Sequence, residues 1–200
     1  MDAEQVVHNE TFSGKDWALL EVNRVHYEDC AFHDVDWSES RLTGCTFTHC
    51  QFGNVRFNAA ELVRCAILQS QLQRCSFFDA TLTDCKLTGT SFLDCGLRPL
   101  TVDGGDWSFV SLRGQNLTGG KLRGLRLRDA DLTSADLTRV DLGNADLSNA
   151  RLKDAVLKTT DLRGADLGGV ALKGIDLTGA KIDLAQAVLV ATAYGAKVSG

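Results

Sequence analysis

Residues 128–150 read RDADLTSADLTRVDLGNADLSNA, in which a leucine returns at every fifth position. The same frame extends in both directions from Phe12 to Ile182, where all 35 positions hold a large apolar residue and the frame never slips. A period of five matches neither the 3.6-residue period of a helix nor the two-residue period of a strand. It indicates a chain that turns a corner about every five residues and points its large side chains inward.

A second column, of small side chains, lies two residues before each large one. It holds alanine or valine in many repeats and also every cysteine of the chain: Cys30, Cys45, Cys50, Cys65, Cys75, Cys85 and Cys95. Free cysteine packs as a small hydrophobe, and the number of cysteines is odd, so we expect reduced core thiols rather than a disulfide framework. Coils of this kind stack about 4.8 Å apart, as neighbouring strands do, and each contacts only its neighbours.

Composition and charge narrow the class of protein. The formal net charge of −5 argues against a general nucleic-acid binder, and the acids are concentrated in residues 2–39. No apolar run approaches the roughly 18 residues that a membrane span needs. The segment Met1–Glu10 is polar and acidic, unlike a signal peptide. We therefore expect a cytoplasmic protein with no membrane association and no direct binding of nucleic acid.

The Ala-Asp-Leu centres of residues 128–150, and RGADLGG at 163–169, resemble the pentapeptide-repeat family, whose consensus is A(D/N)LXX. In that family four pentapeptides close one square coil of twenty residues. The resemblance implies an all-β solenoid, a right-handed quadrilateral β-helix. We place this β-helix at residues 10–183, after an N-terminal tail over residues 1–9 and before a C-terminal capping and dimerisation segment over residues 184–200.

Two segments carry a narrower resemblance. CGLRPLTVDGGDWSFVSLRGQNL at 95–117 and LTGAKIDLAQAVLVATAYGAKVSG at 177–200 are similar to the mycobacterial-type fluoroquinolone-resistance proteins, the MfpA type, and more distantly to the Qnr proteins. Those proteins bind DNA gyrase as dimers that imitate B-form DNA. Qnr proteins usually carry loops that project from their coils, and the unbroken frame here predicts none, which favours the MfpA type.

The repeat stops after Ile182, where Asp183 is a good N-cap for a short helix over 184–194 that Gly195 ends. A solenoid needs its open end covered, so a simple cap is one interpretation of this helix. The resemblance implies that this end also forms a homodimer, and we assign the interface to Leu184, Val188, Leu189 and Ala191.

Aspartate recurs directly before the large residue in many repeats. Each such side chain could simply bond to nearby backbone, as Asx residues do. Regular acidic columns could also imitate the dense charge of a phosphate backbone and attract a groove that normally holds DNA. On twenty-residue coils two faces carry them, one with Asp16, Asp36, Asp136 and Asp176, the other with Asp106, Asp146 and Asp166. These seven residues are the predicted partner-binding site.

Basic side chains share another face: Arg113, Arg151, Lys153 and Lys173. They are explained as solubilising charges, as the face turned away from the partner, or as contacts to acidic patches on it.

Catalytic and metal-binding constellations are not evident. The four histidines show no metal-ligand spacing, and His49 beside Cys50 and Cys45 makes a poor zinc site because both thiols should point inward. The VDGGD stretch at 102–106 lacks the Lys and Ser/Thr of a phosphate loop. Stacked outward side chains offer no cleft. We therefore expect no enzyme, no cofactor and no metal.

The leading hypothesis is a DNA-mimicking protein that binds DNA gyrase, a type II topoisomerase, modulates its activity and protects it from quinolone-type or other poisons. One alternative is a pentapeptide-repeat scaffold for an unrelated protein partner, with no topoisomerase role. Another is self-immunity against a peptide antibiotic, which uses the same chemistry in a different setting.

Overall fold

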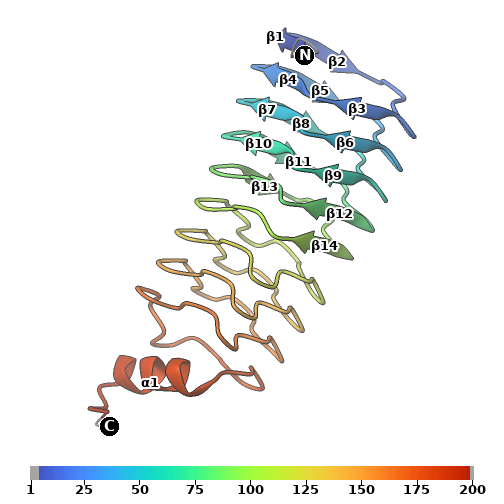
Figure 1. Cartoon of the computed structure of the whole chain (residues 1–200). Helices are drawn as coiled ribbons and strands as arrows, with labels where there is room; N and C mark the ends of the chain where they lie inside the picture. Colours follow the sequence, from blue (N-terminus) through green and yellow to red (C-terminus); the bar gives the residue numbers. More distant parts are fainter. Residues whose placement is uncertain (1–4, 199–200) are drawn as a thin grey trace.

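The computed structural model describes residues 5–198 and shows a rod of stacked coils with a helix at its C-terminal end (Figure 1). The four sides of the coil are called faces 1 to 4, in the order in which the chain first meets them. Paired residues on one face are twenty apart, as in Val7↔Tyr27. The fold is the predicted right-handed quadrilateral β-helix.

Three faces carry parallel strands in the N-terminal half of the rod. Face 1 consists of β1 (Gln5–His8), β4 (Val25–Glu28), β7 (Thr46–Thr48) and β10 (Ala66–Leu68). Face 2 consists of β2 (Thr11–Ser13), β5 (Ala31–His33), β8 (Gln51–Gly53), β11 (Gln71–Gln73) and β13 (Ser91–Leu93). Face 4 consists of β3 (Glu21–Asn23), β6 (Arg41–Thr43), β9 (Glu61–Val63), β12 (Ala80–Thr83) and β14 (Leu100–Asp103).

Face 3 is built differently, because its coils meet through single bridges followed by tight turns, beginning with Asp16↔Asp36. Face 1 adopts the same form from Lys86 onward, and faces 2 and 4 adopt it after Leu93 and Asp103, respectively. The twenty-residue register continues to Asp161↔Lys181. Figure 1 shows the change as arrows in the N-terminal half and plain loops below them. The frame holds no inserted loop within residues 5–182.

The core follows the two predicted columns. In the N-terminal half aromatic rings stack from coil to coil, with centroids 5.0 Å apart for Tyr27 and Phe47 and 4.8 Å apart for Phe57 and Phe77. In the C-terminal half leucine and alanine take their place, and most are buried. The thiols are free and face inward, as predicted; Cys50 donates to the carbonyl oxygens of Tyr27 and Thr48, and burial raises its pKa to about 12.

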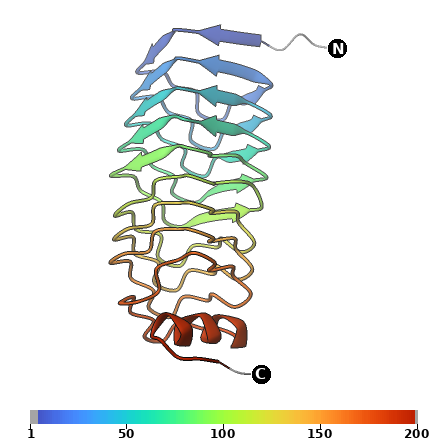
Figure 2. The same cartoon turned by 90° about the vertical axis from the view of Figure 1, so that its left-hand side faces the viewer.

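Both ends refine the predicted boundaries. Strand β1 starts at Gln5 and pairs with β4, so the β-helix begins inside the segment that the sequence placed in a tail over residues 1–9. At the other end, α1 (Leu184–Ala193) lies across the last coil (Figure 2). Asp183 caps it as predicted, in a capping box with Gln186. The helix is too short to cross a membrane.

Gln186 anchors α1 to the rod. Its side chain is buried, and Nε2 donates to the carbonyl oxygens of Leu162 at 2.6 Å and Ala165 at 2.9 Å. Val190 and Ala193 pack against the core beside it. Because these contacts close the open end of the solenoid, α1 is a cap whatever else it contacts.

Candidate partner-binding surface

Each aspartate that directly precedes a large core residue forms a hydrogen bond with the nearby backbone. Its Oδ1 accepts a hydrogen bond from the N–H two residues later, as Asp136 does from Thr138 at 2.9 Å and Asp166 from Gly168 at 2.8 Å. The bond recurs at Asp16, Asp36, Asp106, Asp131, Asp136, Asp141, Asp146, Asp161, Asp166 and Asp176. The backbone-bonding interpretation is therefore confirmed, and it holds each carboxylate in a fixed orientation.

Three of the seven predicted site residues have an arginine beside them. Oδ2 of Asp36 lies 2.7 Å from Nη2 of Arg56, and the hydrogen bond from that guanidinium lowers the pKa of Asp36 to about 2. Asp106 pairs with Arg126 at 2.8 Å. Asp146 lies 3.7 Å from Arg128. These pairs offset the acidic charge locally, which the sequence prediction did not foresee.

The other four site residues, Asp16, Asp136, Asp166 and Asp176, form no ion pair within residues 5–198. Three of them are exposed, and Asp136 is half-buried. Hydrogen bonds from Thr138 and Thr178 lower the pKa values of Asp136 and Asp176, respectively. The structure thus concentrates uncompensated charge from these columns on face 3, with Asp166 on face 1.

Face 3 holds further residues that the column of aspartates did not reveal. Glu39 and Asp79 lie at its corners, exposed, with φ of 56° and 58°. Phe78 stands next to Asp79 and is 58% exposed. The signal was present in the sequence, because Phe78 and Phe109 are the phenylalanines outside the five-residue frame. Large aromatic side chains are frequent anchors in protein interfaces, so Phe78 is a candidate contact for a partner.

Near the N-terminal end, coil stacking brings together three possible metal ligands that are separated in the sequence. Ligand atoms of Glu28, Asp29 and His49 lie within 4.8 Å of one another. The same groups make ion-pair contacts, 2.9 Å between His8 and Glu28 and 3.8 Å between His49 and Asp29. The absence of a metal site stays a prediction.

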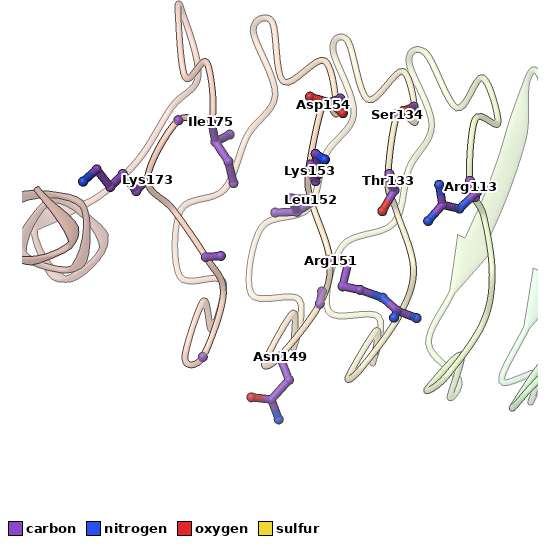
Figure 3. Close-up of a pocket in the computed structure, with 14 residues that line it drawn as sticks. Arg113, Thr133, Ser134, Asn149, Arg151, Leu152, Lys153, Asp154, Lys173 and Ile175 are labelled. Carbon is purple, nitrogen blue, oxygen red and sulfur yellow. The ribbon is translucent and has the colours of Figure 1, made fainter.

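The basic residues share face 2, as the twenty-residue coil predicts. Arg113 and Arg151 approach one carboxylate, that of Asp131, at 3.3 and 3.8 Å. A hollow of about 710 Å³ spans this part of face 2 (Figure 3). The expectation that outward side chains leave no concave surface is therefore wrong here, because small residues interrupt the stacks.

The predicted interface residues lie on α1. Leu184 is 81% exposed and Leu189 is 40% exposed, whereas Val188 and Ala191 are half-buried. Tyr194 follows the helix, accepts a hydrogen bond from the N–H of Gly174 at 3.2 Å, and keeps most of its ring exposed. The rod therefore ends in an apolar surface outside the cap contacts.

Comparisons with known proteins agree with this architecture. The family described as pentapeptide repeats matches residues 28–62, 108–144 and 141–179. No curated protein sequence matches significantly. A trypsin-treated variant of QnrB1, described as a plasmid-mediated fluoroquinolone resistance protein, is similar in structure, with a TM-score of 0.87, 20% identity and 98% of each chain covered.

Full-length QnrB1 superposes with a TM-score of 0.71 at 18% identity, over 96% of this chain and 100% of that one. HetL, a pentapeptide repeat protein involved in heterocyst differentiation regulation in the cyanobacterium Nostoc, gives 0.61 at 20% identity, over 89% and 87%. The narrower resemblance to the MfpA type stays a prediction. The frame, the coil and the matched repeats together establish that this chain belongs to the pentapeptide-repeat family.

Proposed function

We propose that the protein binds DNA gyrase where the enzyme normally holds duplex DNA, moderates its activity and protects it from fluoroquinolone-type poisons. The observation that carries this proposal is the set of carboxylates on face 3 that form no ion pair among the described residues and are held by backbone hydrogen bonds. The structural likeness to QnrB1, a fluoroquinolone resistance protein, supports it.

The physical basis is charge attraction by an ordered surface. A groove that binds DNA is basic and attracts a rod with negative faces, which speeds association and selects the partner. Because the Asx hydrogen bonds already orient the carboxylates, little side-chain entropy is lost on binding. Occupation of the groove competes with DNA, so fewer enzyme–DNA complexes form on which a poison can act.

Charge alone is a weak imitation of DNA. Duplex DNA carries one charge per about 1.7 Å of axis, whereas coils repeat at about 4.8 Å and only some carry an uncompensated acid. We therefore assign part of the binding free energy to apolar contact and shape. Phe78, exposed on face 3, supplies such a contact.

A homodimer through α1 extends the rod. Leu184, Val188 and Ala191 have the i, i+4, i+7 spacing of one helical stripe. A second copy on this stripe covers Leu184 and places the acidic N-terminal coils at both far ends. Sedimentation of Leu184→Glu/Leu189→Glu against the unmodified chain tests this: the variant sediments as a monomer, and a variant that stays dimeric contradicts the assignment.

The charge hypothesis is tested by Asp16→Asn/Asp136→Asn/Asp176→Asn, the three site carboxylates of face 3 that form no ion pair within residues 5–198. An asparagine Oδ1 still accepts the backbone bond, so the substitution removes charge and keeps the coil. The matched control is Asp84→Asn/Asp94→Asn/Asp154→Asn, which changes the net charge equally at other corners. We expect the first variant to need at least about tenfold more protein to inhibit gyrase supercoiling, and the control less than about twofold. Equal effects in both would refute the site.

The alternative is a scaffold for an unrelated partner. HetL has the same fold and is described in the regulation of heterocyst differentiation, so the fold itself does not specify gyrase. Capture of a partner other than gyrase by the unmodified chain, lost in the same triple variant, favours the alternative. Capture of gyrase supports the proposal.

A further inference from the structure

The hollow on face 2 has no role in the proposed binding of gyrase. It lies at the C-terminal end of the rod, where Gly169, Ala171 and Gly174 leave the surface low beside longer side chains. Its volume, about 710 Å³, lies within the range of small-molecule sites, roughly 300–1,000 Å³.

The hollow carries excess positive charge. Arg113 and Arg151 share the single carboxylate of Asp131, whose side chain is 13% exposed. Figure 3 shows both guanidinium groups converging on the coil of Thr133. A guanidinium has five donors, and one Nε–H to Asp131 is the side-chain hydrogen bond that Arg113 makes in the described structure. Most of the donors of both arginines therefore stay available.

Other lining groups extend the same chemistry. Lys153 and Lys173 form no ion pair with residues 5–198, and Asp154 is the acid at the rim. Lys173 extends toward α1 in Figure 3, on a flexible stem that can turn back. Thr133 and Ser134 add hydroxyl groups to the lining, and Asn149 adds an amide group. Ala171 and Ile175 provide apolar surface.

We propose that this hollow binds a small molecule that carries a chain of phosphate groups. Guanidinium groups bind phosphate oxygens in bidentate fashion. Because several cations surround one hollow, a ligand with several phosphate groups matches their charge better than a ligand with a single carboxylate. Arg113, Arg151 and Lys153 contact the phosphates. The low floor at Ala171 and Ile175 accepts an apolar ring attached to them, as in a nucleoside triphosphate.

The test is calorimetric titration of the purified full chain at about 150 mM salt, with inorganic triphosphate in one arm and ATP in the other. We expect one saturable site. Equal affinities show that the site recognises the phosphate chain alone, and tighter binding of ATP shows that the apolar floor contacts the base. Both results support the proposal, whereas no saturable binding of either compound overturns it.

Matched variants locate the site. Arg151→Gln/Lys153→Gln removes two cations from the hollow, and Arg139→Gln/Lys158→Gln removes the same two types from exposed positions on face 3 at nearby coils. The first pair weakens binding at least about tenfold and the second less than about twofold. Equal losses would show diffuse attraction and overturn the proposal. No topoisomerase is present, so failure here leaves the proposed gyrase function standing.

Discussion

The two halves of the rod differ in the residues that fill the core and in the backbone geometry of the faces. The N-terminal half stacks aromatic rings and spreads three faces into strands, whereas the C-terminal half stacks leucine on alanine and turns tightly on every face. Every aspartate that precedes a large residue lies outside the strands, either on face 3 or after Asp103. A tight corner leaves one N–H without a ladder partner, and the aspartate accepts from it. The acidic columns therefore accompany the tight corners and are absent from the strands.

Truncation of the aromatic stack should have the largest effect. Phe57 lies between Trp37 and Phe77, with ring centroids 5.3 and 4.8 Å away, and is 1% exposed. Phe57→Ala should lower the free energy of unfolding by about 3–5 kcal/mol, measured by urea denaturation. The exposed Phe78→Ala is the control and should change it by less than about 0.5 kcal/mol. Similar losses in both would contradict the core assignment.

An aromatic residue placed in the tight half should also destabilise the rod. Leu137 occupies the same column as Phe57 but is fully buried among leucine and alanine coils. Leu137→Phe should lower the free energy of unfolding by about 1–3 kcal/mol through overpacking. If it raises stability, the C-terminal coils have room for an aromatic ring and overpacking is not the limiting factor there.

Removal of one corner hydrogen bond should cost less. Asp166 has no ion pair within residues 5–198, and its Oδ1 accepts from the N–H of Gly168. Asp166→Ala should lower the unfolding free energy by about 1 kcal/mol, whereas Asp166→Asn should nearly preserve it. Equal losses would mean that charge rather than the backbone bond matters at these corners.

The smallest effect concerns pH. The hydrogen bond from Arg56 lowers the pKa of Asp36 from 3.8 to about 2. Since the folded-state pKa is depressed, the resulting stability is present above pH 3.8 and is lost as pH falls through about 2. Arg56→Gln should raise the carboxyl pKa of Asp36 toward its ordinary value, as followed by NMR titration. An unchanged pKa would exclude the ion pair as the cause.

The features set by neighbouring residues along the chain could be predicted from the sequence, whereas the contacts between stacked coils could not. The unbroken frame predicted the inward columns, the buried thiols and the cap at Asp183, because each depends on neighbours along the chain. Two features depend on residues about twenty apart in the chain: the pairing of Asp36 with Arg56 and the anchoring of α1 by Gln186. The hollow on face 2 depends on the lengths of side chains in neighbouring coils. The large and small columns alone do not specify which coils spread into strands.

Binding of this rod at the DNA site of gyrase can be tested directly. The direct measurement is a supercoiling assay with purified gyrase, in which the protein is titrated with and without a fluoroquinolone. If the rod occupies the DNA site, we expect inhibition of supercoiling, or rescue from drug-stabilised cleavage, at concentrations well below about tens of micromolar. No effect at tens of micromolar would contradict the claim and leave a pentapeptide-repeat scaffold whose partner is a different protein.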